Sequence, residues 1–229
     1  MIPKIATFCW SGERPMSWLR RQSMESFRRL NPDWRVNLVD TTGRDPCGDG
    51  FRFDILRSDL ARYEELFEIG GFYFDTDIVF VRPIPARWLS SHLALPLCKN
   101  TRRVTHIASL GCTPGHSFFH YLISRCKQAI ESQDVLGYQD LGINILSKLA
   151  IPDDVFPIDT DAMLSHPWDQ VASMWSSAMK KDISPDAIGI HWFGGDRLSE
   201  EMEKRFSESG SPDCIVARAL SMSVPCNSM

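Results

Sequence analysis

The sequence has 229 residues, of which 43% are hydrophobic and 24% are charged, the balance of a globular chain that can build a full core. Its net charge of −4 argues against general nucleic-acid binding. Residues 1–35 hold seven Lys and Arg against three acidic residues, so the acidic excess lies in the rest of the chain. The seven cysteines have no C-x-x-C spacing, which favours free thiols in a reducing compartment over a disulfide framework or a zinc site.

The N-terminus has no long apolar segment, and no run of about 18 apolar residues occurs, so we expect a cytoplasmic protein without a membrane span of its own. The basic excess over residues 1–35 raises the hypothesis of a peripheral contact with an anionic membrane. A solvated helix face is the simpler explanation, because the basic residues do not form a single block. We expect no nucleic-acid partner.

The opening of the chain predicts a strand, a helix and a second strand. Residues 4–10 form the first strand, and Ser17 caps a helix that continues to about Leu30. Asn31-Pro32 ends that helix, and residues 34–39 form the second strand. This order is typical of a parallel sheet with a crossover helix.

A second helix is predicted over residues 53–69, with apolar side chains at helical spacing. Asp59 and Arg62 are three residues apart on this helix. They fit a surface ion pair of about 0.3–0.5 kcal/mol, or a pair that points into the site formed by the next stretch. The residues alone leave both interpretations open.

Two acidic residues interrupt an apolar strand pattern between Ile69 and Val81. Residues i and i+2 of a strand face the same side, so a slight bend at Thr76 would let Asp75 and Asp77 reach one divalent cation. Mg²⁺ and Mn²⁺ prefer such oxygen ligands and keep positions for substrate phosphate. A solvated turn is the alternative, but aromatic and β-branched residues flank the two acids on both sides.

The second half predicts less regular elements. In chain order these are a strand over 93–97, a loop or hairpin over 99–116, a helix over 117–132, a Pro- and Asp-rich connector over 153–161, and a loosely amphipathic segment over 168–181. Residues 187–195 predict a short buried strand that ends at His191, which is either a hydrogen-bonded core residue or a metal ligand. A charged helix over 199–209 precedes residues 210–229, which we expect to be weakly structured.

Three stretches together resemble the glycosyltransferases with a DXD sugar-binding region, of family 32 type, whose core the clostridial glucosylating toxins share. The stretches are Ile2–Trp10, Ser58–Tyr63 and Gly70–Asp77, and the clear resemblance covers about residues 2–85. Residues 138–144 are similar to a segment that flanks the donor sugar in related galactosyltransferases. Residues 190–192 are similar to a C-terminal metal-binding histidine segment.

The resemblance implies a GT-A fold, a Rossmann-like α/β architecture with a mixed, mostly parallel sheet flanked by helices. The predicted strand–helix–strand opening agrees with it. We expect one catalytic domain over residues 1–209, with a nucleotide-sugar-binding half over 1–85 and an acceptor-side half over 86–209. The weakly structured tail over 210–229 follows.

Roles for single residues follow from the resemblance. Trp10 would stack on the nucleotide base, Arg62 would bind the donor phosphate, and Tyr73 would line the sugar pocket. The implied donor-binding set is Phe8, Trp10, Ser58, Asp59, Arg62, Tyr73, Asp75, Thr76, Gln139 and Asn144. The implied catalytic set is Arg62, Asp75, Asp77 and Asp140, and the implied metal ligands are Asp75, Asp77 and His191. For Gln139, Asp140 and Asn144, helix capping on the surface is the alternative.

We expect metal-dependent transfer of a sugar from a nucleotide sugar, with a UDP-sugar as the leading donor and Mn²⁺ or Mg²⁺ as the metal. The acceptor would be a carbohydrate or glycoconjugate, as in polysaccharide biosynthesis, and the resemblance implies retention of anomeric configuration. The family's usual Gly-Pro reads Gly142-Ile143 here, so we expect an unusual acceptor side. A Mg²⁺-dependent phosphatase or nucleotide-sugar hydrolase would use the same acid pair. A carbohydrate-binding module fits the seven Trp residues but leaves the two acids unexplained.

Overall fold

The structure is a computed structural model that describes residues 1–11, 15–42, 51–132, 137–163, 168–177, 183–208 and 210–223. The chain divides into two compact units, which we call the sheet unit and the helical unit. The sheet unit is Met1–Pro15, Trp34–Asp75 and Pro85–Asp159, and the helical unit is Met16–Asp33, Thr76–Ile84 and Thr160–Met229. The boundary falls between Asp75 and Thr76, so each unit contributes one acid of the D-x-D pair.

A six-stranded sheet with the order β2-β1-β3-β6-β5-β7 forms the centre of the sheet unit. Its strands are β1 (Ile5–Trp10), β2 (Arg35–Asp40), β3 (Gly71–Phe74), β5 (Leu93–Leu97), β6 (Ser109–Cys112) and β7 (Phe156–Asp159). β1 pairs in parallel with β2 and β3, and β5 pairs in parallel with β7, whereas β6 runs antiparallel to both of its neighbours. The sheet is therefore mixed and mostly parallel, as predicted, and β1, β2 and β3 end at the same edge.

Two glycines form the turn from α2 (Phe51–Ile69) into β3. Gly70 and Gly71 have φ values of +67° and +95°, which residues with a Cβ rarely adopt. The Gly70 N–H donates to the Leu66 carbonyl at 3.0 Å, a usual way for a helix to end at glycine. A Cβ on Gly71 would lie 2.3 Å from the carbonyl oxygen of Ile5. Glycine at this position therefore allows β3 to lie close beside β1.

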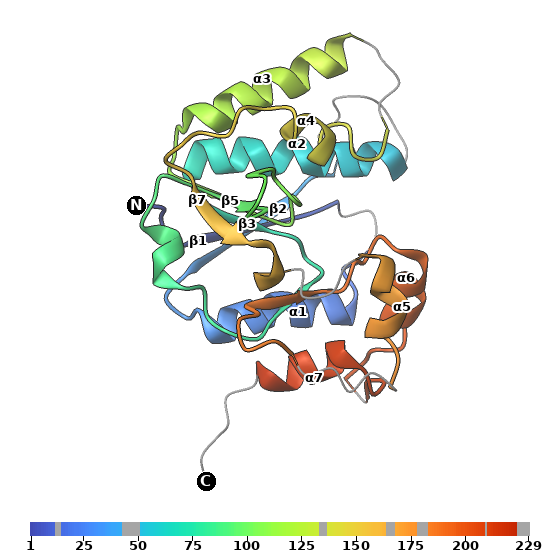
Figure 1. Cartoon of the computed structure of the whole chain (residues 1–229). Coiled ribbons are helices and arrows are strands. Elements are labelled where there is room, and N and C mark those ends of the chain that lie inside the picture. Colours follow the sequence, from blue (N-terminus) through green and yellow to red (C-terminus); the bar gives the residue numbers. More distant parts are fainter. Residues whose placement is uncertain are drawn as a thin grey trace. The chain divides into compact units, whose positions relative to one another are not determined.

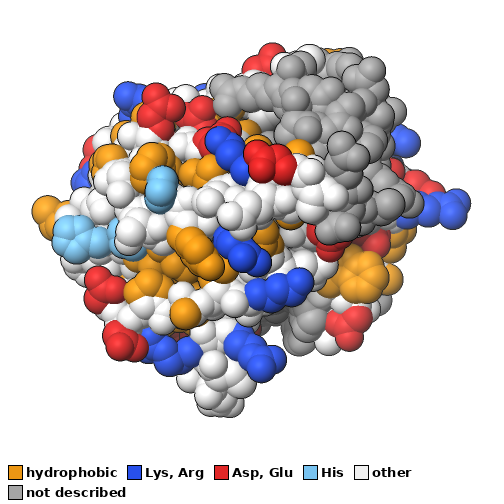
Figure 2. Space-filling view, turned by 90° about the horizontal axis from the view of Figure 1, so that it is seen from above, with side chains coloured by type: hydrophobic (Ala, Val, Ile, Leu, Met, Phe, Trp, Pro, Cys, Tyr) orange, Lys and Arg blue, Asp and Glu red, His pale blue; other side chains and the backbone are white. Residues whose placement is uncertain are grey.

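Helices cover one face of this sheet (Figure 1). α2 contacts β1, β3 and β6, α3 (Ser117–Glu131) packs on α2, and the short helix α4 (Ile143–Leu146) packs on α3. Apolar side chains of these helices and of the sheet, among them Leu56, Tyr63, Leu110 and Phe119, form one buried cluster. Figure 2 views the molecule from this side, where Lys and Arg side chains lie interspersed with Asp and Glu. The 3₁₀ turn η1 (Ala86–Leu89) precedes β5.

The helical unit is built on α1 (Trp18–Leu30) and on a two-stranded antiparallel sheet of β4 (Ile78–Phe80) and β8 (Gly189–His191). α1 packs on β4, and α7 (Ile215–Met222) contacts α1, β4 and β8. The predicted cap is confirmed, because Ser17 Oγ accepts from the Arg20 N–H at 3.2 Å. The remaining elements described in this unit are η2 (Thr160–Ala162), η3 (Trp168–Gln170), α5 (Val171–Met174) and α6 (Arg197–Glu203).

β7 lies where no strand was predicted, and β6 lies in a region predicted as a loop or hairpin. β7 lies inside the predicted connector, and Pro157 is compatible with it because β7 is an edge strand. β6 lies inside the predicted loop or hairpin region, where its small residues conceal the strand pattern. Gly111 is required there, since a Cβ would lie 2.5 Å from the Phe72 ring.

The C-terminal expectations were wrong in two places. Residues 215–222 form helix α7 rather than a weakly structured segment, because Ile215, Val216 and Ala219 form a buried apolar face. α6 begins after Asp196, whose carboxylate accepts from two backbone N–H groups, and ends at Glu203 instead of continuing to residue 209. The predicted segments over 168–181 and 210–229 lie partly outside the described residues.

Candidate active site

Asp75 is the first residue after β3 and belongs to the sheet unit. Its backbone N–H donates to the Ala108 carbonyl at 3.1 Å, just beyond the ladder between β3 and β6. β3 runs parallel to β1, so Asp75 lies at the carboxyl edge of the parallel strands. Ligands of open α/β sheets commonly bind at this edge.

Arg62 connects Asp75 to helix α2. Its Nη2 lies 2.8 Å from Asp59 Oδ1, and its Nη1 lies 3.3 Å from Asp75 Oδ1. Nη1 also donates to the Ile107 carbonyl at 3.2 Å. The Arg62 guanidinium carbon lies 4.3 Å from the centroid of the Tyr73 ring, and the Tyr73 hydroxyl donates to Asp75 Oδ1 at 2.6 Å. The Asp59–Arg62 pair is thus part of a buried network and not a surface ion pair.

Burial sets the protonation of this network. It raises the pKa of Asp59 to about 7, against the lowering effect of the Arg62 guanidinium. Burial also raises the pKa of Tyr73, again opposed by Arg62, so Tyr73 keeps its proton and remains a donor to Asp75. Ser58 supports Arg62 from the preceding turn of α2, where its carbonyl accepts from Nε at 3.3 Å. The guanidinium is therefore held in place on several sides.

Asp77 lies in the helical unit, just before β4. Its Oδ1 is 3.1 Å from His191 Nε2, and its Oδ2 accepts from the Gly194 N–H at 2.6 Å. Burial raises the pKa of Asp77, but His191, Arg20 and the Gly194 N–H outweigh burial, so the pKa lies well below the usual range. Asp77 is therefore a buried, charged carboxylate, a group that proteins hold only with strong partners.

A strained turn after β8 brings the Gly194 N–H to Asp77. Phe193 has a φ of +53°, which is rare for a large side chain. Its ring centroid lies 4.5 Å from that of His191, and the Trp192 N–H donates to the Asp77 carbonyl at 3.0 Å. Backbone strain of this kind concentrates at functional sites.

Thr76, between the two acids, is bound by a residue that sequence reasoning missed. Its Oγ1 accepts from Arg20 Nη1 at 2.8 Å. Arg20 lies on α1 among other basic residues, and nothing in that pattern separates it from the solvated ones. The only indication in the sequence was the basic excess of residues 1–35, which the membrane hypothesis used instead.

The segment from Gly137 to Asn144 lies against the Asp59 side of the network. A Cβ on Gly142 would lie 2.8 Å from Asp59 Oδ2, so only glycine lets the backbone approach this closely. Asp140 accepts from the Gly137 N–H at 2.6 Å and from Asn144 Nδ2 at 2.9 Å. Gln139 and Asn144 are exposed. Their roles toward a donor stay predictions.

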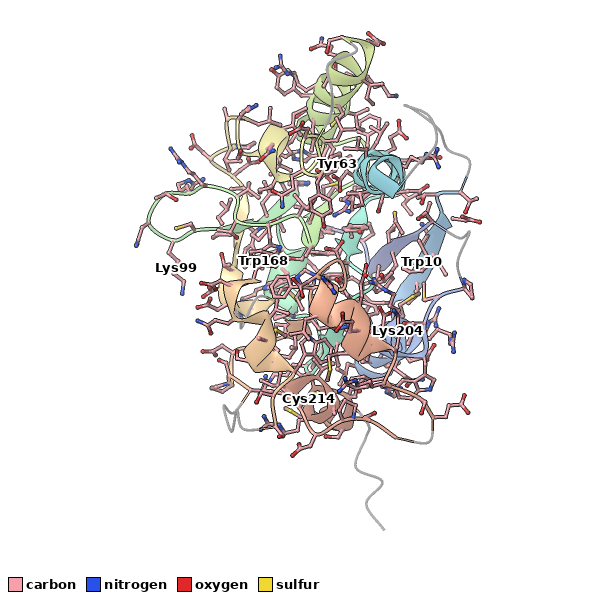
Figure 3. All side chains as sticks on the ribbon, turned by 90° about the vertical axis from the view of Figure 1, so that its right-hand side faces the viewer. Trp10, Tyr63, Lys99, Trp168, Lys204 and Cys214 are labelled. Carbon is pink, nitrogen blue, oxygen red and sulfur yellow. The ribbon has the colours of Figure 1, made fainter. Side chains whose placement is uncertain are left out.

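Two predicted donor-binding residues lie on β1. Phe8 is fully buried, with its ring centroid 6.2 Å from that of Phe74. Trp10 ends the strand opposite Asp40 and is half-buried. Figure 3 shows Trp10 on β1 and Tyr63 on α2. Of the two β1 residues, Trp10 is the one with surface available for a ligand.

The comparison with protein families decides the class of this site. Residues 18–94 match the family described as "Glycosyltransferase sugar-binding region containing DXD motif". This stretch is therefore similar to the sugar-binding region of glycosyltransferases. It contains α2, β3 and both acids, and it covers about a third of the chain. The match and the fold together indicate a glycosyltransferase with the GT-A type of architecture.

Solved structures resemble the chain in fold. The apo form of the glycosyltransferase GlyE of Streptococcus pneumoniae TIGR4 aligns with a TM-score of 0.54 and 12% identity, over 98% of this chain and 61% of GlyE. A second GlyE structure aligns with a TM-score of 0.53 and 13% identity, over 96% of this chain and 61% of GlyE. The chain thus spans about three fifths of the length of GlyE. The galactosyltransferase LgtC, in complex with donor and acceptor sugar analogs, aligns with a TM-score of 0.48 and 10% identity, over 96% of this chain and 95% of LgtC.

A search of curated proteins finds no match to this sequence. Among the described residues, no helix is both long enough and apolar enough to cross a membrane. The hypothesis of a peripheral membrane contact stays a prediction.

Proposed function

We propose that the protein transfers a sugar from a nucleotide sugar, with a UDP-sugar as the leading donor, to a carbohydrate or glycoconjugate acceptor in a reaction that depends on Mn²⁺ or Mg²⁺. The observation that carries the proposal is the position of the acid pair. Asp75 and Asp77 follow β3 at the carboxyl edge of the sheet, inside the matched sugar-binding region. Retention of configuration and a role in polysaccharide biosynthesis belong to the same proposal.

The predicted metal ligands fit a divalent cation. Asp75, Asp77 and His191 would each offer one ligand atom, two carboxylate oxygens and one imidazole nitrogen. The two acids are separated by one residue, so their Cα atoms lie within about 7 Å by chain geometry alone. Asp77 is buried and charged, which favours a bound cation, and its carboxylate is oriented by the Gly194 N–H. When bound, the cation would neutralise the diphosphate and the charge that develops on the leaving nucleotide.

Residues of the sheet unit would hold the donor. Arg62 carries a fixed positive charge beside Asp75, suited to a phosphate or to a sugar hydroxyl. Asp59, with a pKa of about 7, can hold a proton near neutral pH and donate it in a hydrogen bond to a sugar oxygen. Trp10, half-buried at the end of β1, would stack on the base. These groups bind and orient the donor before the reaction.

A panel of nucleotide sugars, each incubated with Mn²⁺ or with EDTA and a mixture of sugar acceptors, tests this function. We expect one nucleotide sugar to be consumed only with metal, with sugar appearing on an acceptor and nucleoside diphosphate released. Release of inorganic phosphate without sugar transfer would instead support the hydrolase alternative, which no feature of the described residues favours.

A further inference from the structure

Arg20 is a charged side chain outside the predicted donor-binding set, although it binds Thr76, the residue between the two acids. Its Nη1 donates to Thr76 Oγ1 at 2.8 Å, and its Nε lies 3.1 Å from Glu203 Oε1. Glu203 also accepts from the Ser17 hydroxyl. All four residues belong to the helical unit, and the side chains of Arg20 and Glu203 are only 13% and 12% exposed.

The turn after β8 is shaped around the same guanidinium. Its carbon lies 4.9 Å from the centroid of the Trp192 ring. A Cβ on Gly194 would lie 2.1 Å from Arg20 Nη2, so a side chain at this position would displace the guanidinium. The N–H of Gly194 donates to Asp77. Arg20 therefore contacts both segments that determine where the Asp77 carboxylate points.

We propose that Arg20 is a positioning residue that fixes Thr76 and the Gly194 turn, and thereby orients the Asp77 carboxylate for cation binding. This inference rests on the proposed function, because it assigns Arg20 a part in that same metal site. Arg20 need not touch the donor for this role. Groups that orient metal ligands commonly change metal affinity by about 10- to 100-fold when they are lost.

Position 20 requires the planar guanidinium of arginine, which can donate hydrogen bonds in two directions at once. Nε and Nη1 point in different directions, toward Glu203 and Thr76, which the single ammonium of lysine cannot reproduce. A residue that served only the stability of α1 would tolerate lysine better. The Arg20→Lys substitution keeps the charge and removes the fork, so it separates geometry from electrostatics.

The experiment measures binding of Mn²⁺ alone to the purified chain by electron paramagnetic resonance, with a melting curve for each variant. We expect Arg20→Lys and Thr76→Val each to weaken Mn²⁺ binding by about tenfold or more. The double variant should be no weaker than the worse single one, since both remove the same contact. Thr76→Ser, which restores the hydroxyl that accepts from Arg20, should bind Mn²⁺ more tightly than Thr76→Val.

Arg28→Lys is the matched control, because Arg28 pairs with Glu25 on the exposed part of the same helix. Its Mn²⁺ affinity should not change. If Arg20→Lys does not fold, Thr76→Val and Gly194→Ala test the same contact from its other sides. Wild-type affinity in Thr76→Val, or additive losses in the double variant, would overturn the inference. Absence of Mn²⁺ binding by the wild type would overturn the proposed metal dependence itself, and the inference with it.

Discussion

The Tyr73 hydroxyl donates to Asp75 Oδ1 at 2.6 Å, while the guanidinium of Arg62 lies over the Tyr73 ring. Tyr73 and Asp75 are two residues apart at the end of β3, so strand geometry places both side chains on one side of the sheet. Tyr73 thus orients Asp75, a predicted metal ligand, through its hydroxyl, and its ring packs against the Arg62 guanidinium. Asp75 would enter the reaction already fixed in direction.

Tyr73→Phe should therefore lower sugar transfer with little loss of stability. The ring under Arg62 remains, and only the hydrogen bond to Asp75 is lost, which contributes about 1 kcal/mol to folding. We expect a fall in turnover of about tenfold or more, the scale for residues that orient metal ligands. Turnover and a melting curve measure the two effects. Tyr121→Phe, at an exposed position on α3, is the matched control.

The pKa of Asp59 predicts a pH dependence of folding stability. Burial raises this pKa from 3.8 to about 7, so between these values the folded chain keeps a proton that the unfolded chain releases. The free energy of unfolding must then fall as pH rises from about 4 to about 7, and level off above. Asp59→Asn lacks this titration. Relative to Asp59→Asn, the free energy of unfolding of the wild type should thus fall by on the order of a few kcal/mol from about pH 4 to about pH 7.

Denaturant unfolding of both proteins at pH 5 and pH 7.5 measures this difference. A stability difference that is the same at both pH values would show that Asp59 stays ionised beside Arg62 throughout. In that case Asp59 could accept hydrogen bonds from the nucleotide sugar but could not donate one to it.

Trp10→Ala should weaken binding of UDP in the presence of Mn²⁺ by about 1–3 kcal/mol, the range for stacking of a base on an aromatic ring. Calorimetric titration with UDP measures it. Trp168→Ala, at a 65% exposed tryptophan of the helical unit, controls for general effects of losing an indole. Unchanged UDP affinity in a folded Trp10→Ala protein would return Trp10 to a purely structural role at the end of β1.

Much of the fold could be predicted because local patterns and packing agree. The apolar run of β1, the Ser17 cap and the Gly70-Gly71 turn each point to the element that forms. β7 was not predicted, and β6 was predicted only as part of a loop or hairpin. Gly111 and Pro157 are unusual in strands and are explained by the close Phe72 ring and by an edge position. α7 was missed because it is only eight residues long, so helical spacing of its apolar residues is hard to recognise in the sequence.

The site was predictable where chemistry and spacing coincide along the sequence. Two acids inside an apolar stretch suggested the D-x-D pair, and the i,i+3 spacing of Asp59 and Arg62 allowed the network that forms. Arg20 could not be found in this way, because its partner Thr76 is 56 residues further along the chain. Long-range contacts of this kind appear only after folding.

The direct test of the metal-dependent nucleotide site is the affinity for UDP, with Mn²⁺ and with EDTA, of the wild type and of Asp77→Asn. Asparagine keeps the shape of Asp77 but removes the charge that a hard cation requires. Asp196→Asn is the control, since Asp196 caps α6 and asparagine caps helices equally well. We predict that the wild type and Asp196→Asn bind UDP with Mn²⁺ at least 100-fold more tightly than with EDTA, and that folded Asp77→Asn loses this gain. Equal UDP affinity with Mn²⁺ and EDTA in the wild type, or an unchanged gain in Asp77→Asn, would contradict the metal-dependent site.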